Sequence, residues 1–109
     1  MALQHASSGQ AVALLRDGED LSQFSSIALA KTAQLELIRI VLPQGKTMPE
    51  HKVPGDITVQ CLHGAIAFQA HGKEVLLEQG AVLYLDGGIW HALRAERDSV
   101  ILLTIRLVG

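Results

Sequence analysis

Two histidines stand out in this sequence as side chains that can do chemistry. His51 lies in the segment from Gly45 to Gly64, and His91 ends the segment that begins at Gly80. Imidazole changes its protonation state near neutral pH and is the commonest metal ligand among side chains. The pair could therefore transfer protons, accept hydrogen bonds from a ligand or hold a metal ion. Each role requires the two rings to lie close together in the folded chain.

The residues around both histidines follow a definite spacing. The first segment fits the pattern G-x5-H-x-H-x3-E-x6-G in its spacing at Gly45, His51, Val53, Ile57 and Gly64. The second fits G-x5-P-x-G-x2-H-x3-N at Gly80, Asp86, Gly88, His91 and Ala95. These patterns resemble the two motifs of the cupin family, here a small single-domain cupin of the cupin 2 conserved barrel type. The resemblance covers about half of the chain.

The resemblance implies an all-β fold, a single antiparallel jelly-roll β-barrel with both motifs lining its interior. In the family, two histidines and one glutamate of the first motif meet the histidine of the second motif around a divalent metal. Such nitrogen and oxygen ligands suit Fe, Mn, Ni, Cu or Zn and leave positions open for substrate or dioxygen. The resemblance therefore implies that His51 and His91 are metal ligands in this chain.

This chain departs from the family at two of the four ligand positions. Val53 stands where the family has its second histidine, and Ile57 stands where it has the carboxylate. Asp56 is a third candidate ligand, but it is one residue out of register, so on a regular strand its side chain points away from the pocket. A bulge near Pro54 and Gly55 could turn it inward. The metal-ligand set is therefore incomplete.

Alternation along the strands predicts the walls of the pocket. Residues two apart on a strand face the same way, so the side chains that share the inward face with the histidines can be named. They form a mostly apolar predicted pocket of His51, Val53, Ile57, Val59, Cys61, Trp90 and His91.

Several of these residues also have a plain structural interpretation. The two histidines could be satisfied by hydrogen bonds or water rather than by a ligand. Cys61 fits a small buried hydrophobe better than a reactive thiol, because no nearby positive charge stabilises a thiolate. Trp90 fits either packing or the rim of the pocket. Glu50 and Tyr84 are expected to be ordinary surface or packing residues, and His63 and His71 to be exposed.

The elements that must position these side chains are short strands. Segments between the glycines and prolines are rich in Val, Ile, Leu and Thr and show no helical period. His71 and Gly72 predict a tight hairpin turn, and residues 21–24 a short helical turn. We expect residues 1–25 to form an N-terminal arm with the first strand and residues 26–109 the barrel, all in one domain. The expected strands lie near residues 10–15, 27–31, 35–42, 57–63, 65–70, 73–78, 81–85, 90–95 and 100–107.

Composition limits the classes of partner. A chain of 109 residues has room for one domain, and its net charge of −2 with scattered lysines and arginines argues against nucleic acid. No segment resembles a signal peptide or approaches the roughly 20 apolar residues of a membrane helix, so we expect a cytoplasmic protein without membrane contact. Cys61 is the only cysteine, which excludes an internal disulfide. The apolar composition, 49% of residues, favours a homodimer, with its contact expected on residues 10–15 and 27–31 or on the apolar C-terminal strand.

Three functions are compatible with these observations. The leading hypothesis is a stand-alone cupin that binds a small molecule in the pocket around His51 and His91. The alternative is a mononuclear metal-dependent enzyme of dioxygenase or isomerase type, with water or Asp56 completing the ligand set. The third is a dimerisation module whose barrel interior is filled.

Overall fold

Nine strands make up the regular structure of the protein in a computed structural model that describes residues 5–108. No helix occurs among these residues, and hence none that is long and apolar enough to span a bilayer. Eight of the nine expected strands are confirmed to within two residues at each end. The strands are β1 (Ser25–Lys31), β2 (Leu35–Leu42), β3 (Thr47–His51), β4 (Ile57–His63), β5 (Ala65–Ala70), β6 (Lys73–Glu78), β7 (Val82–Leu85), β8 (His91–Ala95) and β9 (Ser99–Arg106).

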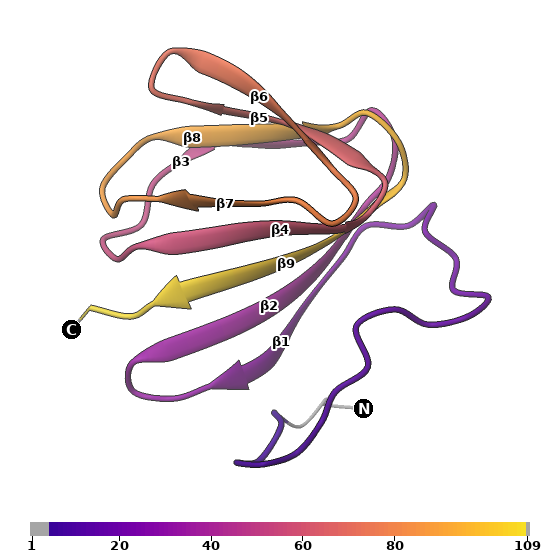
Figure 1. Cartoon of the computed structure of the whole chain (residues 1–109), viewed down its shortest axis with the longest axis vertical. Helices are drawn as coiled ribbons and strands as arrows, with labels where there is room; N and C mark the ends of the chain where they lie inside the picture. The colour runs from indigo at the N-terminus through magenta and orange to yellow at the C-terminus, as the bar shows by residue number, and fades with distance from the viewer. Residues whose placement is uncertain (1–4, 109) are drawn as a thin grey trace.

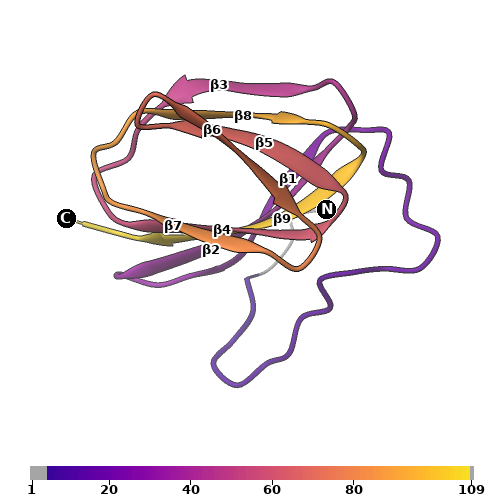
Figure 2. The same ribbon diagram turned by 45° about the horizontal axis from the view of Figure 1, so that its top comes forward.

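The strands form two antiparallel sheets that face each other as layers (Figures 1 and 2). The first has the order β1-β2-β9-β4-β7 and the second the order β3-β8-β5-β6. Sequence neighbours are repeatedly placed in opposite sheets, which is the jelly-roll arrangement that the resemblance implied. β9 lies between β2 and β4, so both its edges are paired. Ile101 of β9 lies in the core, whereas Leu102 on its other face lines a hollow together with Val12 and Leu14 of the N-terminal arm, so apolar side chains are needed on both faces.

The core lies between the two sheets and is built by strict alternation. On β4, Ile57, Val59 and Cys61 are buried, whereas Thr58 is exposed. The core side chains that meet them come from β2, β5, β6, β7, β8 and β9. They are almost entirely aliphatic, with Phe68 as the one large aromatic ring. The buried core comprises Ile40, Leu42, Ile57, Val59, Cys61, Ile66, Phe68, Leu77, Leu85, Leu93, Ala95 and Ile101.

The turn between β5 and β6 has the form expected from its sequence. His71 and Gly72 both adopt positive φ, 53° and 69°, which matches the twist of a two-residue hairpin loop. Ala70 and Lys73 are register partners on either side of it. The hairpin is therefore confirmed. Its first strand, β5, ends at Ala70, which is the register partner of His91, the first residue of β8.

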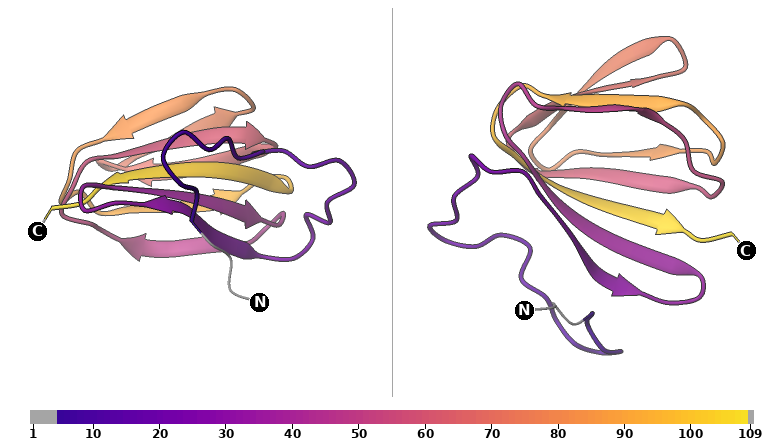
Figure 3. Two further views of the ribbon diagram at one scale, coloured as in Figure 1. Left: turned by 90° about the horizontal axis from the view of Figure 1, so that it is seen from below. Right: turned by 180° about the vertical axis from the view of Figure 1, so that it is seen from behind.

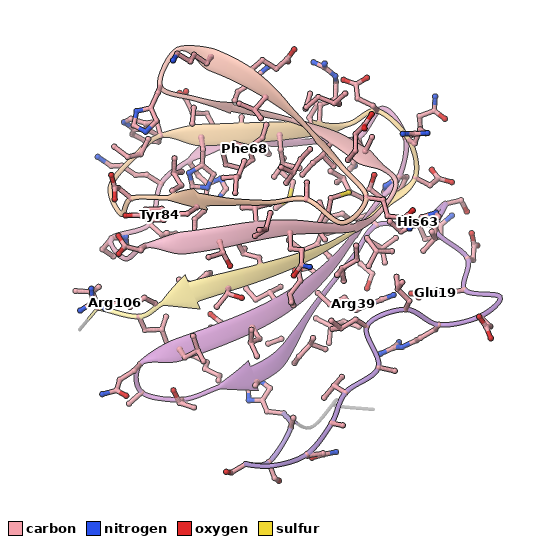
Figure 4. All side chains as sticks on the ribbon, viewed as in Figure 1. Glu19, Arg39, His63, Phe68, Tyr84 and Arg106 are labelled. Carbon is pink, nitrogen blue, oxygen red and sulfur yellow. The ribbon has the colours of Figure 1, made fainter. Side chains whose placement is uncertain are left out.

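The N-terminal arm corrects two expectations. Residues 10–15 form no strand and residues 21–24 no helical turn; β1 begins at Ser25. The arm instead runs along the outside of the first sheet (Figure 3). Arg39 of β2, which is only 2% exposed, donates to the Leu14 carbonyl oxygen over 2.7 Å and forms an ion pair with Glu19 (Figure 4). Residues 10–15 are thus held by the bond between Arg39 and the Leu14 carbonyl oxygen, not by the backbone hydrogen bonds of a strand pair.

One strand was not foreseen. β3 contains Pro49 and Glu50, which are poor strand formers, and its side chains are mostly exposed. It is tolerated because β3 is an edge strand that pairs only with β8. Its register with β8 shifts between Met48 and His51, as at a β-bulge.

Candidate functional site

The register of β3 and β8 places the two histidines directly opposite each other. His51 and His91 are Cα partners in this pair of strands, and their ring centroids lie 4.3 Å apart with 58° between the planes. His91 is 4% exposed and His51 is half-buried. Two imidazoles from motifs far apart in the sequence therefore meet at one end of the barrel, with His51 on the more accessible side.

Two loops hold this arrangement at the end of the barrel. The Gly88 amide donates to the Val53 carbonyl oxygen over 2.7 Å, and the Gly87 amide donates to the Asp56 carboxylate over 2.9 Å. Gly87 lies so close to the Pro54 carbonyl oxygen that a Cβ atom would collide with it. Glycine is therefore required here by close contact of the β7–β8 loop with the β3–β4 loop.

Backbone carbonyls fix which nitrogen of each ring is available. His51 Nδ1 lies 3.1 Å from the Pro49 carbonyl oxygen, and His91 Nδ1 lies 2.9 Å from that of Ile89. A carbonyl oxygen can only accept, so each Nδ1 carries the proton and each Nε2 keeps a lone pair in the neutral ring. Both Nε2 atoms can then accept a hydrogen bond or bind a metal ion.

The surroundings of His91 favour its neutral form. Burial is the main cause that lowers its pKa from the usual 6.5, and the neighbouring His51 lowers it further, while the hydrogen bond to Ile89 acts in the opposite direction. The pKa of His91 is lowered in sum. The ring can thus act as an acceptor at neutral pH.

The predicted apolar walls of the pocket are packed into the core. Ile57, Val59 and Cys61 are at most 3% exposed, and Val53 packs against the same cluster. The Cys61 thiol donates to the His63 carbonyl oxygen over 3.4 Å, and burial raises its pKa. The geometry agrees with Cys61 as a small buried hydrophobe.

Asp56 is not brought to the histidines. Its carboxylate accepts the bond from Gly87 and so serves to join the two loops. Within residues 5–108, no three His, Cys, Asp or Glu side chains are grouped closely enough to hold a metal ion. Two imidazoles alone make a weak site for a divalent ion, so the donor set of these residues fits a mononuclear metal centre poorly.

Trp90 lies apart from the imidazole pair. Its side chain is 53% exposed, and the ammonium group of Lys52 lies over its ring, 4.9 Å from the centroid. It lines a hollow of about 610 Å³ at the adjacent rim of the barrel. The rim interpretation of Trp90 thus agrees with its position, but the structure shows no contact between its ring and the histidines.

Sequence reasoning missed one member of the site. The Phe68 ring stacks on His91 with centroids 5.6 Å apart and 14° between the planes. The register explains the contact, because Phe68 pairs with Leu93 and so shares the inward face of the sheet with His91. The β5–β6 hairpin that contains Phe68 could be predicted from the sequence. The pairing of β5 with β8, which brings Phe68 to His91, could not.

Comparisons with known proteins agree with the fold. The sequence profile of the family described as Cupin domain matches residues 38–105. A conserved protein of unknown function from Streptococcus pyogenes superposes with a TM-score of 0.78 at 22% identity, over 99% of this chain and 98% of that one. A cupin superfamily protein from Desulfitobacterium hafniense gives 0.76 at 20% identity over 100% of both chains. KdgF from Halomonas sp. gives 0.72 at 19% identity, over 86% of this chain and 87% of its own. No curated protein matches.

Proposed function

Because the chain belongs to the cupin domain family, whose profile covers residues 38–105, we propose that it binds a small organic molecule through His51 and His91. The observation that carries this proposal is the pair of adjacent rings, 4.3 Å apart, whose Nδ1 atoms are both engaged by backbone carbonyls. Two Nε2 acceptors therefore point to a ligand that donates hydrogen bonds. The apolar side chains around them favour a ligand with an apolar body.

Access to this site comes from the side of His51. That ring is half-buried, whereas His91 is enclosed by Phe68 and the core. A ligand that reaches the pair therefore meets His51 first and needs a small displacement of neighbouring side chains to reach His91. A hydroxyl or amide group is the expected anchor, since either can donate to a neutral imidazole.

The competing function is a mononuclear metal-dependent enzyme, of dioxygenase or isomerase type. One observation favours it: histidines that bind metals commonly donate their second ring nitrogen to a carbonyl, as both do here. The donor count argues against it, because Val53 and Ile57 occupy the other two ligand positions of the family. A metal would need water or a bound molecule to complete its coordination.

Elemental analysis combined with native mass spectrometry separates these functions. The protein is purified without an affinity tag or a chelator, and an organic ligand or a metal ion is sought in the same sample. A retained organic ligand that is lost in His91→Asn but kept in the exposed hairpin variant His71→Asn supports the proposal. Near-stoichiometric metal with dioxygen consumption supports the enzyme. If the protein holds neither an organic ligand nor a metal and binds no added hydroxyl or amide compound, both the binding function and the enzyme function are overturned. A structural module with a filled barrel interior would then remain.

We also propose that the chain forms a homodimer. Val82 and Tyr84 lie on the outward face of β7, because Leu83 and Leu85 pair with the core residues of β4, and they are 59% and 58% exposed. These apolar and aromatic side chains would gain burial against a second copy. Light scattering at micromolar concentration is expected to give twice the monomer mass, and Val82→Lys is expected to shift it toward the monomer. A monomer in the unaltered protein contradicts this proposal.

A further inference from the structure

The hollow beside Trp90 is a distinct feature of the barrel rim. It lies between the residues that lead into β8 and the tip of the β5–β6 hairpin, which are neighbours in Figure 1. We call it the rim hollow. It is lined by Glu50, Gln69, Ala70, His71, Gly72, Lys73, Glu74, Gly88, Ile89 and Trp90, and neither His51 nor His91 is among these residues. A molecule in the rim hollow would therefore be held by a different set of side chains.

Two charged groups of opposite sign line the rim hollow without an ion-pair partner among residues 5–108. They are the Glu50 carboxylate and the Lys73 ammonium. The third charged residue, Glu74, is already engaged, since Gln69 donates to it over 3.2 Å and Arg94 lies 3.5 Å away. The rim hollow thus offers one negative charge and one positive charge that are not engaged in an ion pair.

These two charges lie on opposite sides of the rim hollow. Glu50 belongs to β3 and Lys73 to β6, the two outer strands of the second sheet, with β8 and β5 between them. Three strand spacings of roughly 4.8 Å separate the two backbones by about 14 Å. Both side chains are long, so the gap between their charged ends matches a ligand whose own charges are several bonds apart.

Apolar side chains line the rim hollow together with the two charges. Trp90 is half exposed, and Ile89 and Ala70 complete this part of the lining. Lys52 lies over the Trp90 ring but does not line the rim hollow. Its positive charge disfavours a purely cationic ligand on the indole, and the carboxylate of Glu50 disfavours a purely anionic one.

We propose that the rim hollow binds a small zwitterion of dipeptide size, with its carboxylate at Lys73, its ammonium at Glu50 and its apolar side chain against Trp90. A volume of about 610 Å³ accommodates such a molecule with water around it. This site is independent of the proposed ligand site at His51 and His91. It is also shallow and exposed, so each charged contact contributes modestly.

The chain carries its own reporter for the test, because Trp90 is its only tryptophan. Tryptophan fluorescence and amide NMR shifts of Gly72 and Gly88 are followed during titration with alanyl-leucine, N-acetyl-alanyl-leucine and alanyl-leucine amide. The zwitterion is expected to perturb both signals at the lowest concentration. Each capped form should bind about two- to fivefold more weakly, the amount that one exposed ion pair contributes.

Charge variants assign the two contacts. Lys73→Gln should abolish the preference for a free carboxylate and keep the preference for a free ammonium, and Glu50→Gln should do the reverse. Lys31→Gln and Asp17→Asn, exposed positions away from the rim hollow, should leave all three affinities unchanged. Equal binding of the three compounds would show stacking on Trp90 alone and would overturn the proposal. So would unshifted signals with all three up to millimolar concentration.

Discussion

Phe68 lies flat against the His91 ring, with ring centroids 5.6 Å apart and only 14° between the planes. The contact joins β5 to β8 across the inner face of the second sheet. It encloses a polar ring in an apolar core, and the single hydrogen bond from Nδ1 to the Ile89 carbonyl oxygen satisfies one of its nitrogens. His91 is thus part of the packing as well as part of the candidate site.

His91→Ala is therefore expected to destabilise the protein by about 2 kcal/mol or more, as for other buried ring truncations. A histidine on the wall of a solvent-accessible pocket would instead cost roughly 1 kcal/mol or less when truncated. Urea unfolding measures the difference. His71→Asn in the exposed hairpin serves as the control, because asparagine tolerates the positive φ of residue 71, and it should lie within about 0.5 kcal/mol of the parent. A comparably small loss for His91→Ala would show that the ring is not a packing group.

Stability should fall as the pH drops below the usual histidine range. The pKa of His91 is lowered from 6.5 in the folded chain, so the unfolded chain binds more protons than the folded chain in this range. The stability that the neutral His91 ring contributes is present above pH 6.5. It is lost as the pH falls through the lowered pKa of His91. Urea midpoints at pH 7.5 and pH 5.5 test this. His91→Phe should lose less stability between the two pH values than the parent, and His71→Gln should match the parent; identical slopes in all three contradict the prediction.

Val53→His should raise the affinity for Ni or Zn by about tenfold or more, equivalent to roughly 1.4 kcal/mol. Val53 is half-buried and packs against the core cluster, and it follows His51 by two residues at the end of the barrel where the histidines meet. A third imidazole there would complete a stronger donor set. Val82→His, on the outward face of β7, and Leu35→His, at the exposed start of β2 and away from the proposed dimer contact, are the controls. A competition titration in which Val53→His gains no more than the two controls would show that residue 53 does not face the imidazole pair.

Glu19→Gln should loosen the N-terminal arm. Arg39 is buried beneath the arm, so loss of its carboxylate partner leaves a guanidinium charge without compensation. Tryptic cleavage after Arg16 is expected to accelerate several-fold, because the open form of the arm becomes more populated. Asp20→Asn, which removes a carboxylate that within residues 5–108 accepts hydrogen bonds from Ser22 alone, should not change the rate. Arg39→Met should also accelerate cleavage, because it removes both the ion pair with Glu19 and the bond to the Leu14 carbonyl oxygen.

The strands that sequence analysis located best are those whose side chains alternate between core and surface. β2, β4, β5 and β6 have the predicted bounds, because burial of one face imposes a period of two that is visible in the residues themselves. Residues 10–15 have strand-like composition but pair with no strand; Arg39 instead bonds to the Leu14 carbonyl oxygen and to Glu19. β3 has the opposite character: Pro49 and Glu50 disfavour a strand, yet pairing with β8 imposes one.

The resemblance to the cupin motifs implied the jelly-roll fold and the meeting of His51 and His91 in one barrel. Glycine positions and alternation are local properties, so they can be recognised without coordinates. The way in which the site is filled follows from contacts that exist only in the folded chain. Phe68 reaches His91 from another strand, Gly87 captures Asp56, and Trp90 faces the rim hollow. Each of these depends on contacts between segments far apart in the chain, and alternation specifies the face of a side chain but not its neighbour across the core.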